Sequence, residues 1–299
     1  MPLDDRKILV VGGTGFLGRP VAQMLDFFGF PIRIFTHSPA KAKDMYGKHY
    51  DIAVGDIADP ASIERAMDGC YGVHINLSGG PKPDDYGRIE YLGTKAIVEA
   101  AKKLNVKRLT YISGASVSAD RLWFPPTRAK YMAEQEIINS GLEYAIFRAT
   151  WFMESLPLFV RDGKAIIMGR QPEKIHWIAA KDYARMASRV YMMDEPVKKI
   201  FMVFGPDAYT FADAFEMYRE VIDPAINIIQ TPIGVLRLSA LLTRNARLKD
   251  IVSLMKYFRK HGELGDPIEA DEMLGRPSIT LYNWLENYKN ITSQADVKI

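Results

Sequence analysis

Cysteine is almost absent from this sequence. Of the 299 residues only Cys70 is a cysteine, so no internal disulfide can form. A reducing compartment fits this usage, and we predict a cytoplasmic location.

No apolar run reaches the roughly 18 residues that a helical membrane span requires. The start, MPLDDRKILVV, carries two aspartates and a short apolar run, so no signal peptide is expected.

A strong charge imbalance is also absent. The formal net charge is +3, and no block of Lys and Arg stands out on a predicted face. This pattern argues against nucleic-acid binding. The five histidines are scattered singly, without the His, Asp and Glu spacing of a ligand set, so no metal site is predicted.

Short apolar runs alternate with helical patterns through the first half of the chain. The runs are rich in Val, Ile, Phe and Tyr and predict strands at 7–12, 31–36, 50–56, 72–78, 108–113 and 143–148. Helices are predicted between them at 15–28, 60–68, 86–104 and 127–140. This alternation predicts an α/β fold of the Rossmann type, with a doubly wound parallel sheet.

The alternation of strand and helix patterns becomes less regular after Thr150. Strands are predicted at 164–169 and 198–206, with a helix at 179–193 between them. From about residue 210 the chain reads as mainly helical, and no Gly/Ser-rich or Pro-rich linker separates the parts. We therefore predict a core over 1–150 and a small, mainly helical C-terminal subdomain over 151–299, intertwined with that core.

A glycine-rich loop, VVGGTGFLG, joins the first strand to the first helix. Its glycines recur every three residues, where they allow a tight turn, close approach of a pyrophosphate and close packing of helix on strand. The strand before it and the helix after it are the context that supports dinucleotide binding. The predicted cofactor-binding residues of this loop are Gly12, Thr14, Gly15, Phe16, Leu17 and Gly18.

This loop resembles that of the extended or atypical short-chain dehydrogenases/reductases. The stretch FPPTRAKYMAEQEIINSGLEYAIFR (124–148) is similar to NmrA-like regulators, isoflavone and pinoresinol-lariciresinol reductases and complex I 39-kDa-subunit-like proteins, and the closing MLGRPSITLYNWL is similar to the C-terminus of NmrA-like proteins. The resemblance covers roughly residues 6–190 and implies a Rossmann protein that binds NAD(P).

The segment after the second strand, IFTHSPAKA, bears on the choice of cofactor. NAD-preferring domains place a carboxylate here for the ribose 2′-hydroxyl. This sequence has Thr36, His37 and Ser38, with Lys41 nearby. The missing negative charge favours a 2′-phosphate, so we predict NADP, with NAD possible. In the resembling family an arginine often occupies the position of His37, and His37 is therefore a predicted cofactor-binding residue.

Other cofactor contacts are expected at the carboxyl ends of strands, where such sheets bind ligands. The resemblance places Asp56 and Ile57 beside the adenine, although Asp56 is as readily explained as a turn and cap residue. The remaining predicted contacts are Leu77, Ser78 and Ser113.

The resemblance also implies a Ser, Tyr and Lys set, which this chain does not complete. Lys130 lies on the expected helix, but Pro126 stands where the tyrosine belongs, and Ala115 stands where the serine belongs. The pair Tyr91 and Lys95 has the right spacing but lies before the fifth predicted strand, so we reject it. Lys130 is the predicted catalytic residue, acting as a general acid or holding the ribose.

Three residues are predicted to line the substrate. The loop after the sixth strand of the resembling family implies that Trp151 and Phe152 line the nicotinamide side, and the alternative is that they form core between the two subdomains. His176 lies where the resembling chains re-enter the pocket. The leading hypothesis is an NADPH-dependent reductase of a small uncharged molecule, such as an enone, quinone or enol ether. The alternatives are a non-catalytic NAD(P)H-binding redox sensor or assembly scaffold, and a sugar-nucleotide epimerase or dehydratase, which Pro126 disfavours.

The segment 235–263 mixes aliphatic residues with Arg and Lys. Such a segment covers a core with its basic side solvated, or it contacts a protein partner or a membrane surface.

Overall fold

The computed structural model describes residues 2–80 and 82–296, and its contacts divide the chain into two units. Each unit has its own hydrophobic core. The first unit comprises Met1–Ala149, Tyr183–Val203 and Pro267–Gly275, and the second comprises Thr150–Asp182, Phe204–Asp266 and Arg276–Ile299.

A parallel sheet forms the centre of the first unit. Within the described residues it has seven strands in the order β11-β6-β5-β4-β1-β2-β3. Its strands are β1 Ile8–Val11, β2 Ile32–Thr36, β3 Asp51–Val54, β4 Gly72–Ile75, β5 Arg108–Gly114, β6 Glu143–Ala149 and β11 Lys198–Val203. The predicted doubly wound sheet is confirmed. Strand order reverses between β1 and β4, and ligands bind at such a switch point in open α/β sheets.

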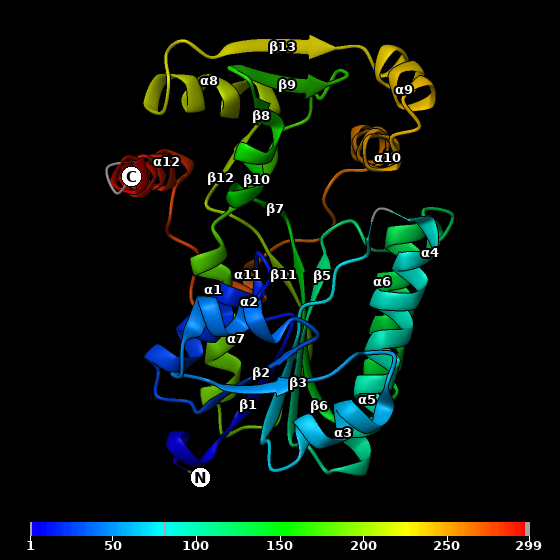
Figure 1. The fold of residues 1–299 in the computed structure, drawn as a ribbon, viewed down its shortest axis with the longest axis vertical. Helices are drawn as coiled ribbons and strands as arrows, with labels where there is room; N and C mark the ends of the chain where they lie inside the picture. Colours follow the sequence, from blue (N-terminus) through cyan, green and yellow to red (C-terminus); the bar gives the residue numbers. More distant parts are fainter. Residues whose placement is uncertain (1, 81, 297–299) are drawn as a thin grey trace. The chain divides into compact units, whose positions relative to one another are not determined.

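Helices cover both faces of this sheet. In Figure 1, α3, α5 and α6 lie on one face, and α1 and α7 lie on the other. The bounds are α1 Gly18–Phe27, α2 Pro39–Tyr46, α3 Pro60–Met67, α5 Gly93–Lys103, α6 Pro125–Ile138 and α7 Ala180–Met192. Shorter elements are η1 Leu3–Asp5, α4 Pro83–Asp85, η2 Tyr86–Leu92, η3 Ala119–Arg121 and α11 Ile268–Leu274. The first part of the helix predicted at 86–104 is thus η2, a π-helical segment that runs into α5.

Two segments of the predicted C-terminal subdomain belong to the first unit. Residues 183–203 do so because β11 pairs in parallel with β6 along its whole length. The buried Arg108 of β5 also donates hydrogen bonds to the carbonyls of Val190, Met193 and Glu195. The second such segment contains α11.

The second unit combines helices with two small sheets. In the part of the chain that the structure describes, each sheet has three strands, ordered β12-β10-β7 and β13-β9-β8. The strands are β7 Trp151–Phe152, β8 Val160–Arg161, β9 Lys164–Met168, β10 Ile175–Ile178, β12 Asp207–Tyr209 and β13 Asn227–Thr231. The helices are η4 Met153–Phe159, α8 Phe211–Val221, α9 Ile233–Leu242, α10 Ala246–Lys260 and α12 Leu281–Asp296. Strand β13 interrupts the region that the sequence predicts as mainly helical.

None of the helices in ranges 2–80 and 82–296 is both long and apolar enough to cross a membrane.

Candidate functional site

The glycine loop is held against the end of β4. Gly12 has φ +76°, and a Cβ built on it would lie 2.1 Å from the backbone oxygen of Asn76. A Cβ on Gly18 would lie 2.2 Å from the oxygen of Gly12. These two positions therefore admit only glycine, one for its turn and the other for the close packing of α1 on the loop.

The middle glycine leaves room beside the loop. A Cβ on Gly15 would meet only the oxygen of Gly12, at 3.0 Å, and its own N–H donates to that oxygen at 2.9 Å. No side chain caps α1, whose N-cap is Leu17. The first N–H groups of a helix lack partners within it, and they carry partial positive charge. This arrangement fits a pyrophosphate, as predicted for a dinucleotide. The individual contacts of Thr14, Phe16 and Leu17 remain predictions.

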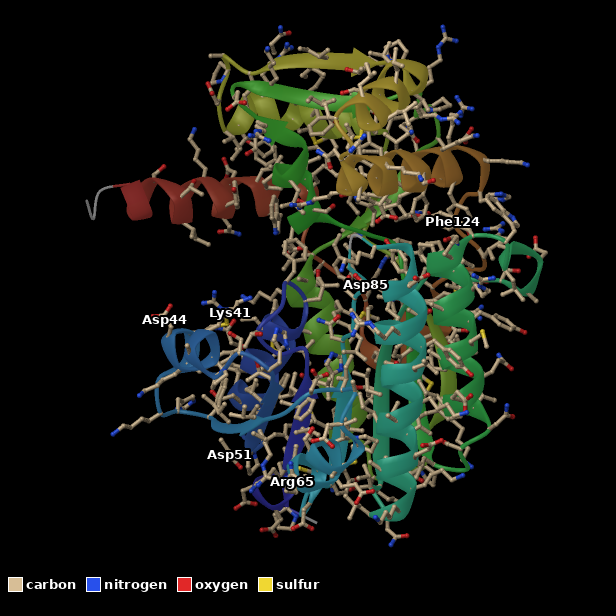
Figure 2. All side chains as sticks on the ribbon, turned by 45° about the vertical axis from the view of Figure 1, so that its right-hand side comes forward. Lys41, Asp44, Asp51, Arg65, Asp85 and Phe124 are labelled. Carbon is tan, nitrogen blue, oxygen red and sulfur yellow. The ribbon has the colours of Figure 1, made fainter. Side chains whose placement is uncertain are left out.

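The end of β2 presents basic side chains beside this loop. His37 is exposed, and Lys41 lies on the exposed side of α2 (Figure 2). The hydroxyl of Tyr46 on α2 donates to the oxygen of Gly13 at 2.6 Å, which ties α2 to the glycine loop. Burial raises the pKa of Tyr46 to about 12, and the positive charge of Arg19 opposes this rise. Arg19 of α1 therefore lies close enough to the end of β2 for its charge to affect Tyr46. The sequence pattern gave no reason to single out this arginine.

The predicted adenine-side residues are partly brought together. Ile57 and Leu77 both pack on Gly93, where a Cβ would lie 2.9 Å from one side chain and 3.1 Å from the other. The exposed Asp56 accepts a hydrogen bond from the N–H of Ala58 at 2.9 Å, as a turn residue does. Ser78 is exposed beside the end of β4. Contact of these residues with adenine or ribose remains a prediction.

Lys130 of α6 pairs with a buried carboxylate. Its Nζ lies 3.1 Å from Oε2 of Glu90 in η2, and the Glu90 side chain is 3% exposed. The other oxygen of Glu90 accepts the N–H of Gly79 at 2.6 Å. The segment after β4 therefore contacts the glycine loop at Asn76 and the Lys130 pair at Gly79. π-helical segments are rare, and they are frequent at functional sites.

An aromatic ring also holds Lys130. Its Nζ lies 5.7 Å from the centre of the Tyr111 ring, within cation–π range. The Tyr111 hydroxyl is buried and has no hydrogen-bond partner among the described residues. Burial, together with the charges of Glu90 and Glu134, raises the pKa of Tyr111 well above its usual value. Tyr111 therefore keeps its proton, whereas the Lys130 side chain is 23% exposed and so reaches solvent.

Ser113 is engaged inside the unit. Its hydroxyl donates to Oε1 of Glu134 at 2.6 Å, and Glu134 is fully buried. Arg148 donates to both oxygens of Glu134, at 3.0 and 2.6 Å. The Ser113 proton is therefore already used, and the predicted contact of Ser113 with the cofactor remains a prediction.

The rejected pair, Tyr91 and Lys95, meets at Glu136 of α6. The hydroxyl of Tyr91 donates to Oε1 of Glu136 at 3.2 Å, and Nζ of Lys95 lies 3.7 Å from the same oxygen. The two side chains thus share the half-buried carboxylate of Glu136. Burial and that carboxylate raise the pKa of Tyr91, while the Lys95 charge opposes the rise.

The predicted substrate-lining residues belong to the second unit. Trp151 packs edge-to-face on Phe211 and Phe258, at ring-centre distances of 5.3 and 4.8 Å, within that unit's core. His176 pairs with Glu263, with its Nδ1 2.7 Å from Oε2 and its backbone N–H donating to Oε1. Phe152, partly buried, pairs with Ile178 in the small sheet. Their contact with a substrate remains a prediction.

Across the described ranges, the structure holds no group of three or more His, Cys, Asp or Glu side chains placed to bind a metal ion.

Sequence reasoning missed the acidic partners of this site. Glu90 sits in a helical stretch whose pattern gives no sign that a carboxylate is buried, since glutamates are almost always exposed unless paired. Glu134 had a usable signal, because it follows Lys130 by four residues and so shares its helix face.

Comparison with known proteins places this geometry among nicotinamide-binding chains. A family model described as NAD(P)H-binding matches residues 12–190. The chain is 25% identical over 239 residues to the photosystem II assembly factor Ycf39 of Cyanophora paradoxa, covering 78% of this chain and 74% of that protein. It is 26% identical over 211 residues to an NAD(P)H azoreductase of Xenophilus azovorans, covering 69% and 70%.

A solved structure shares the fold. The NADPH-dependent quinone oxidoreductase QOR2 of Escherichia coli, complexed with NADPH, matches with a TM-score of 0.72 at 21% identity, covering 94% of this chain and 99% of that one.

Proposed function

The chain belongs to the NAD(P)H-binding family, and we propose that it is an NADPH-dependent reductase of a small uncharged molecule. The observation that carries this proposal is Lys130, held by Glu90 and Tyr111 beside the segment that approaches the glycine loop. The names of two similar proteins, an azoreductase and a quinone oxidoreductase, support reduction of an electron-poor, uncharged acceptor.

In this proposal the cofactor, when bound, supplies a hydride, and the chain supplies the proton. The Lys130 ammonium gives a proton to the oxygen or nitrogen of the acceptor that gains negative charge. Glu90 positions the ammonium and balances its charge, and the Tyr111 ring restricts where it can move. Because the Lys130 side chain is 23% exposed, water restores its proton after each turnover. No hydroxyl stands at Pro126, so Lys130 acts without a tyrosine.

The test is NADPH oxidation with a panel of quinones, azo dyes and enones. We expect turnover with at least one acceptor, and we expect Lys130→Met to lower kcat by about 10²- to 10⁴-fold, the usual contribution of a general acid. Lys95→Met is the matched control, since it removes a lysine of the neighbouring helix α5 whose ion pair is with Glu136 rather than with Glu90. Unchanged kcat with a raised KM for NADPH would instead make Lys130 a ribose anchor.

The variant Glu90→Gln tests whether the negative charge of Glu90, rather than its hydrogen bond with Gly79, matters for catalysis. The amide oxygen still accepts the Gly79 N–H, so the loop keeps its geometry, but Lys130 loses its counter-charge. We expect kcat to fall about 10-fold, equivalent to about 1.4 kcal/mol, while affinity for NADPH changes little. Full activity in this variant would remove Glu90 from the mechanism.

We also propose that NADPH is preferred over NADH. Residues 36–42 after β2 carry no carboxylate and include His37 and Lys41, and Arg19 of α1 lies near Tyr46 of the adjoining helix α2. Lys41→Glu is expected to weaken NADPH binding about 10-fold more than NADH binding in calorimetry, because only NADPH carries the 2′-phosphate. Lys43→Glu changes the net charge equally from a different face of α2 and is the control. An equal loss of affinity for NADPH and NADH in Lys41→Glu would contradict this preference.

The alternative is a non-catalytic NAD(P)H-binding scaffold. Two observations favour it: the hydroxyl of Ser113 is occupied by Glu134, and a similar protein is named as an assembly factor. NADPH binding without oxidation by any acceptor of the panel would select this alternative. Turnover that is lost in Lys130→Met would exclude it.

A further inference from the structure

We propose that the helical hairpin of α9 and α10 docks on the surface of an anionic lipid bilayer. This inference is independent of the proposed reductase function. It rests on an outward apolar face and a surrounding set of cations within the second unit.

Helix α9 presents aliphatic side chains on two opposite faces. Leu236 and Ala240 are buried on one face and hold the helix on its unit. The opposite face carries Val235, Leu238, Leu241 and Leu242, which are 57%, 57%, 74% and 74% exposed. Their spacing of three, four and seven residues puts them on one stripe. Contiguous exposed leucines mark a surface that meets an apolar phase or a partner.

The hairpin is also strongly basic. Residues 233–260 contain seven Lys and Arg but a single acidic residue, Asp250, while the whole chain is nearly balanced at +3. The basic residues are Arg237, Arg244, Arg247, Lys249, Lys256, Arg259 and Lys260. This local excess complements an anionic surface.

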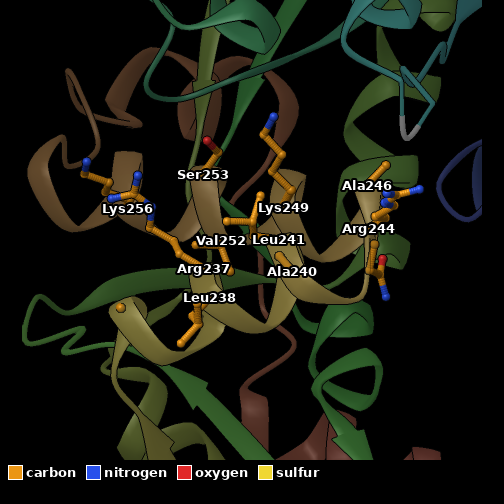
Figure 3. Close-up of a pocket in the computed structure, with 12 residues that line it drawn as sticks. Arg237, Leu238, Ala240, Leu241, Arg244, Ala246, Lys249, Val252, Ser253 and Lys256 are labelled. Carbon is orange, nitrogen blue, oxygen red and sulfur yellow. The ribbon is translucent and has the colours of Figure 1, made fainter.

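A groove lies between the apolar stripe of α9 and basic side chains of the hairpin. A pocket of about 770 Å³ lies along the hairpin, with Leu238 and Leu241 of α9 and Lys249 and Lys256 of α10 among the residues that line it (Figure 3). Long cationic side chains rest their stems on apolar surface and keep their charges at the polar boundary. The groove therefore suits lipid chains beside anionic headgroups.

The composition favours a bilayer over a protein partner. Protein interfaces concentrate aromatic residues and Arg at their centre and are depleted of Lys. The outward stripe of α9 is purely aliphatic, and among the described residues the groove beside it is lined by two lysines and two arginines but by no aromatic side chain. Helix α9 has 10 residues, so it would lie in the membrane surface rather than cross the bilayer.

The test is flotation of the full-length protein with vesicles at about 50 mM salt, where charge attraction is weakly screened. One vesicle population is phosphatidylcholine alone, and the other contains phosphatidylglycerol in addition. We expect binding to the anionic vesicles, weaker binding to the neutral ones and a decrease with salt. Leu241→Ser with Leu242→Ser is expected to reduce the bound fraction at least about 10-fold.

Two controls match this variant. Leu158→Ser with Ile291→Ser removes two exposed aliphatic side chains of the same unit and should leave binding unchanged. Lys249→Glu with Lys256→Glu should abolish binding to anionic vesicles, whereas Lys48→Glu with Lys102→Glu, an equal charge change on exposed residues of the first unit, should not.

Absence of binding to anionic vesicles, or binding that is unaltered by the α9 double variant, would overturn the proposal. Self-association of the protein that is lost in the same variant, without vesicle binding, would mean that a second copy covers the stripe and would equally overturn it.

Discussion

Gly12→Ala is expected to weaken NAD(P)H binding by about 100-fold or more, equivalent to about 2.7 kcal/mol. The added methyl group would lie 2.1 Å from the backbone oxygen of Asn76, and Gly12 has φ +76°. Because the obstacle is backbone at the end of a buried strand, relief requires the glycine loop to move away from β4. That movement displaces the N–H groups that would hold the pyrophosphate.

Calorimetric titration with NADPH measures this effect, and Gly29→Ala is its control. Gly29 follows α1 with φ +89°, but a Cβ there would meet nothing within 4 Å. The control therefore carries the backbone strain of a positive φ, about 1–2 kcal/mol, without the collision. If both variants bound NADPH equally well, the loop would not be the cofactor site. Thermal unfolding of each variant separates loss of binding from loss of fold.

Arg108→Met is expected to lower the free energy of unfolding by about 3–5 kcal/mol, the usual cost of removing one partner of a buried ion pair. Arg108 is fully buried in β5 and donates twice to Oε2 of Glu143, from Nε at 3.0 Å and Nη2 at 2.6 Å. It also donates to three backbone carbonyls of the segment that leads into β11. Methionine has similar length but leaves the three carbonyls without the donor and removes both guanidinium hydrogen bonds from Glu143.

Urea unfolding of the Arg108 variant is compared with that of Lys107→Met. Lys107 also pairs with Glu143, at 2.5 Å, but its side chain is 54% exposed, so its loss is expected to cost about 0–1 kcal/mol. Equal destabilisation by the two variants would show that Arg108 contributes no more than a surface charge.

The same carboxylate predicts a pH effect. Burial raises the pKa of Glu143, but hydrogen bonds and positive charge from Lys107 and Arg108 outweigh this and leave the pKa below its usual 4.5. The folded state thus binds the ionised form more strongly, and this stabilisation is present above pH 4.5 and lost as the pH falls through the lowered pKa. The stability of Glu143→Gln should accordingly depend less on pH in this acidic range than that of the unchanged protein.

Local sequence pattern predicted the first half of the chain well. The six apolar runs up to residue 148 correspond to β1 to β6, and the predicted parallel doubly wound sheet is confirmed. The predicted NAD(P)-binding family is confirmed as well. These features are readable because apolar periodicity and glycine spacing are local properties of the chain.

The second half was harder to predict. The short strands β7, β8, β10, β12 and β13 were not identified. All of them but β8 pair with segments distant in the sequence. The assignment of residues 183–203 to the first unit likewise depends on β11 finding β6 and on the contacts of Arg108. Strand propensity depends strongly on such neighbours, so a single sequence gives a weak signal.

By itself, the sequence determined the Rossmann-type sheet, the glycine loop and a lysine on α6 without its tyrosine. Only the tertiary structure decided what holds that lysine. Glu90 and Tyr111 lie on η2 and β5, far from Lys130 in the chain, and meet it through the packing of α6 on η2. Burial of a carboxylate leaves no periodic trace in the sequence, because its stabilisation comes from a partner that folding brings to it.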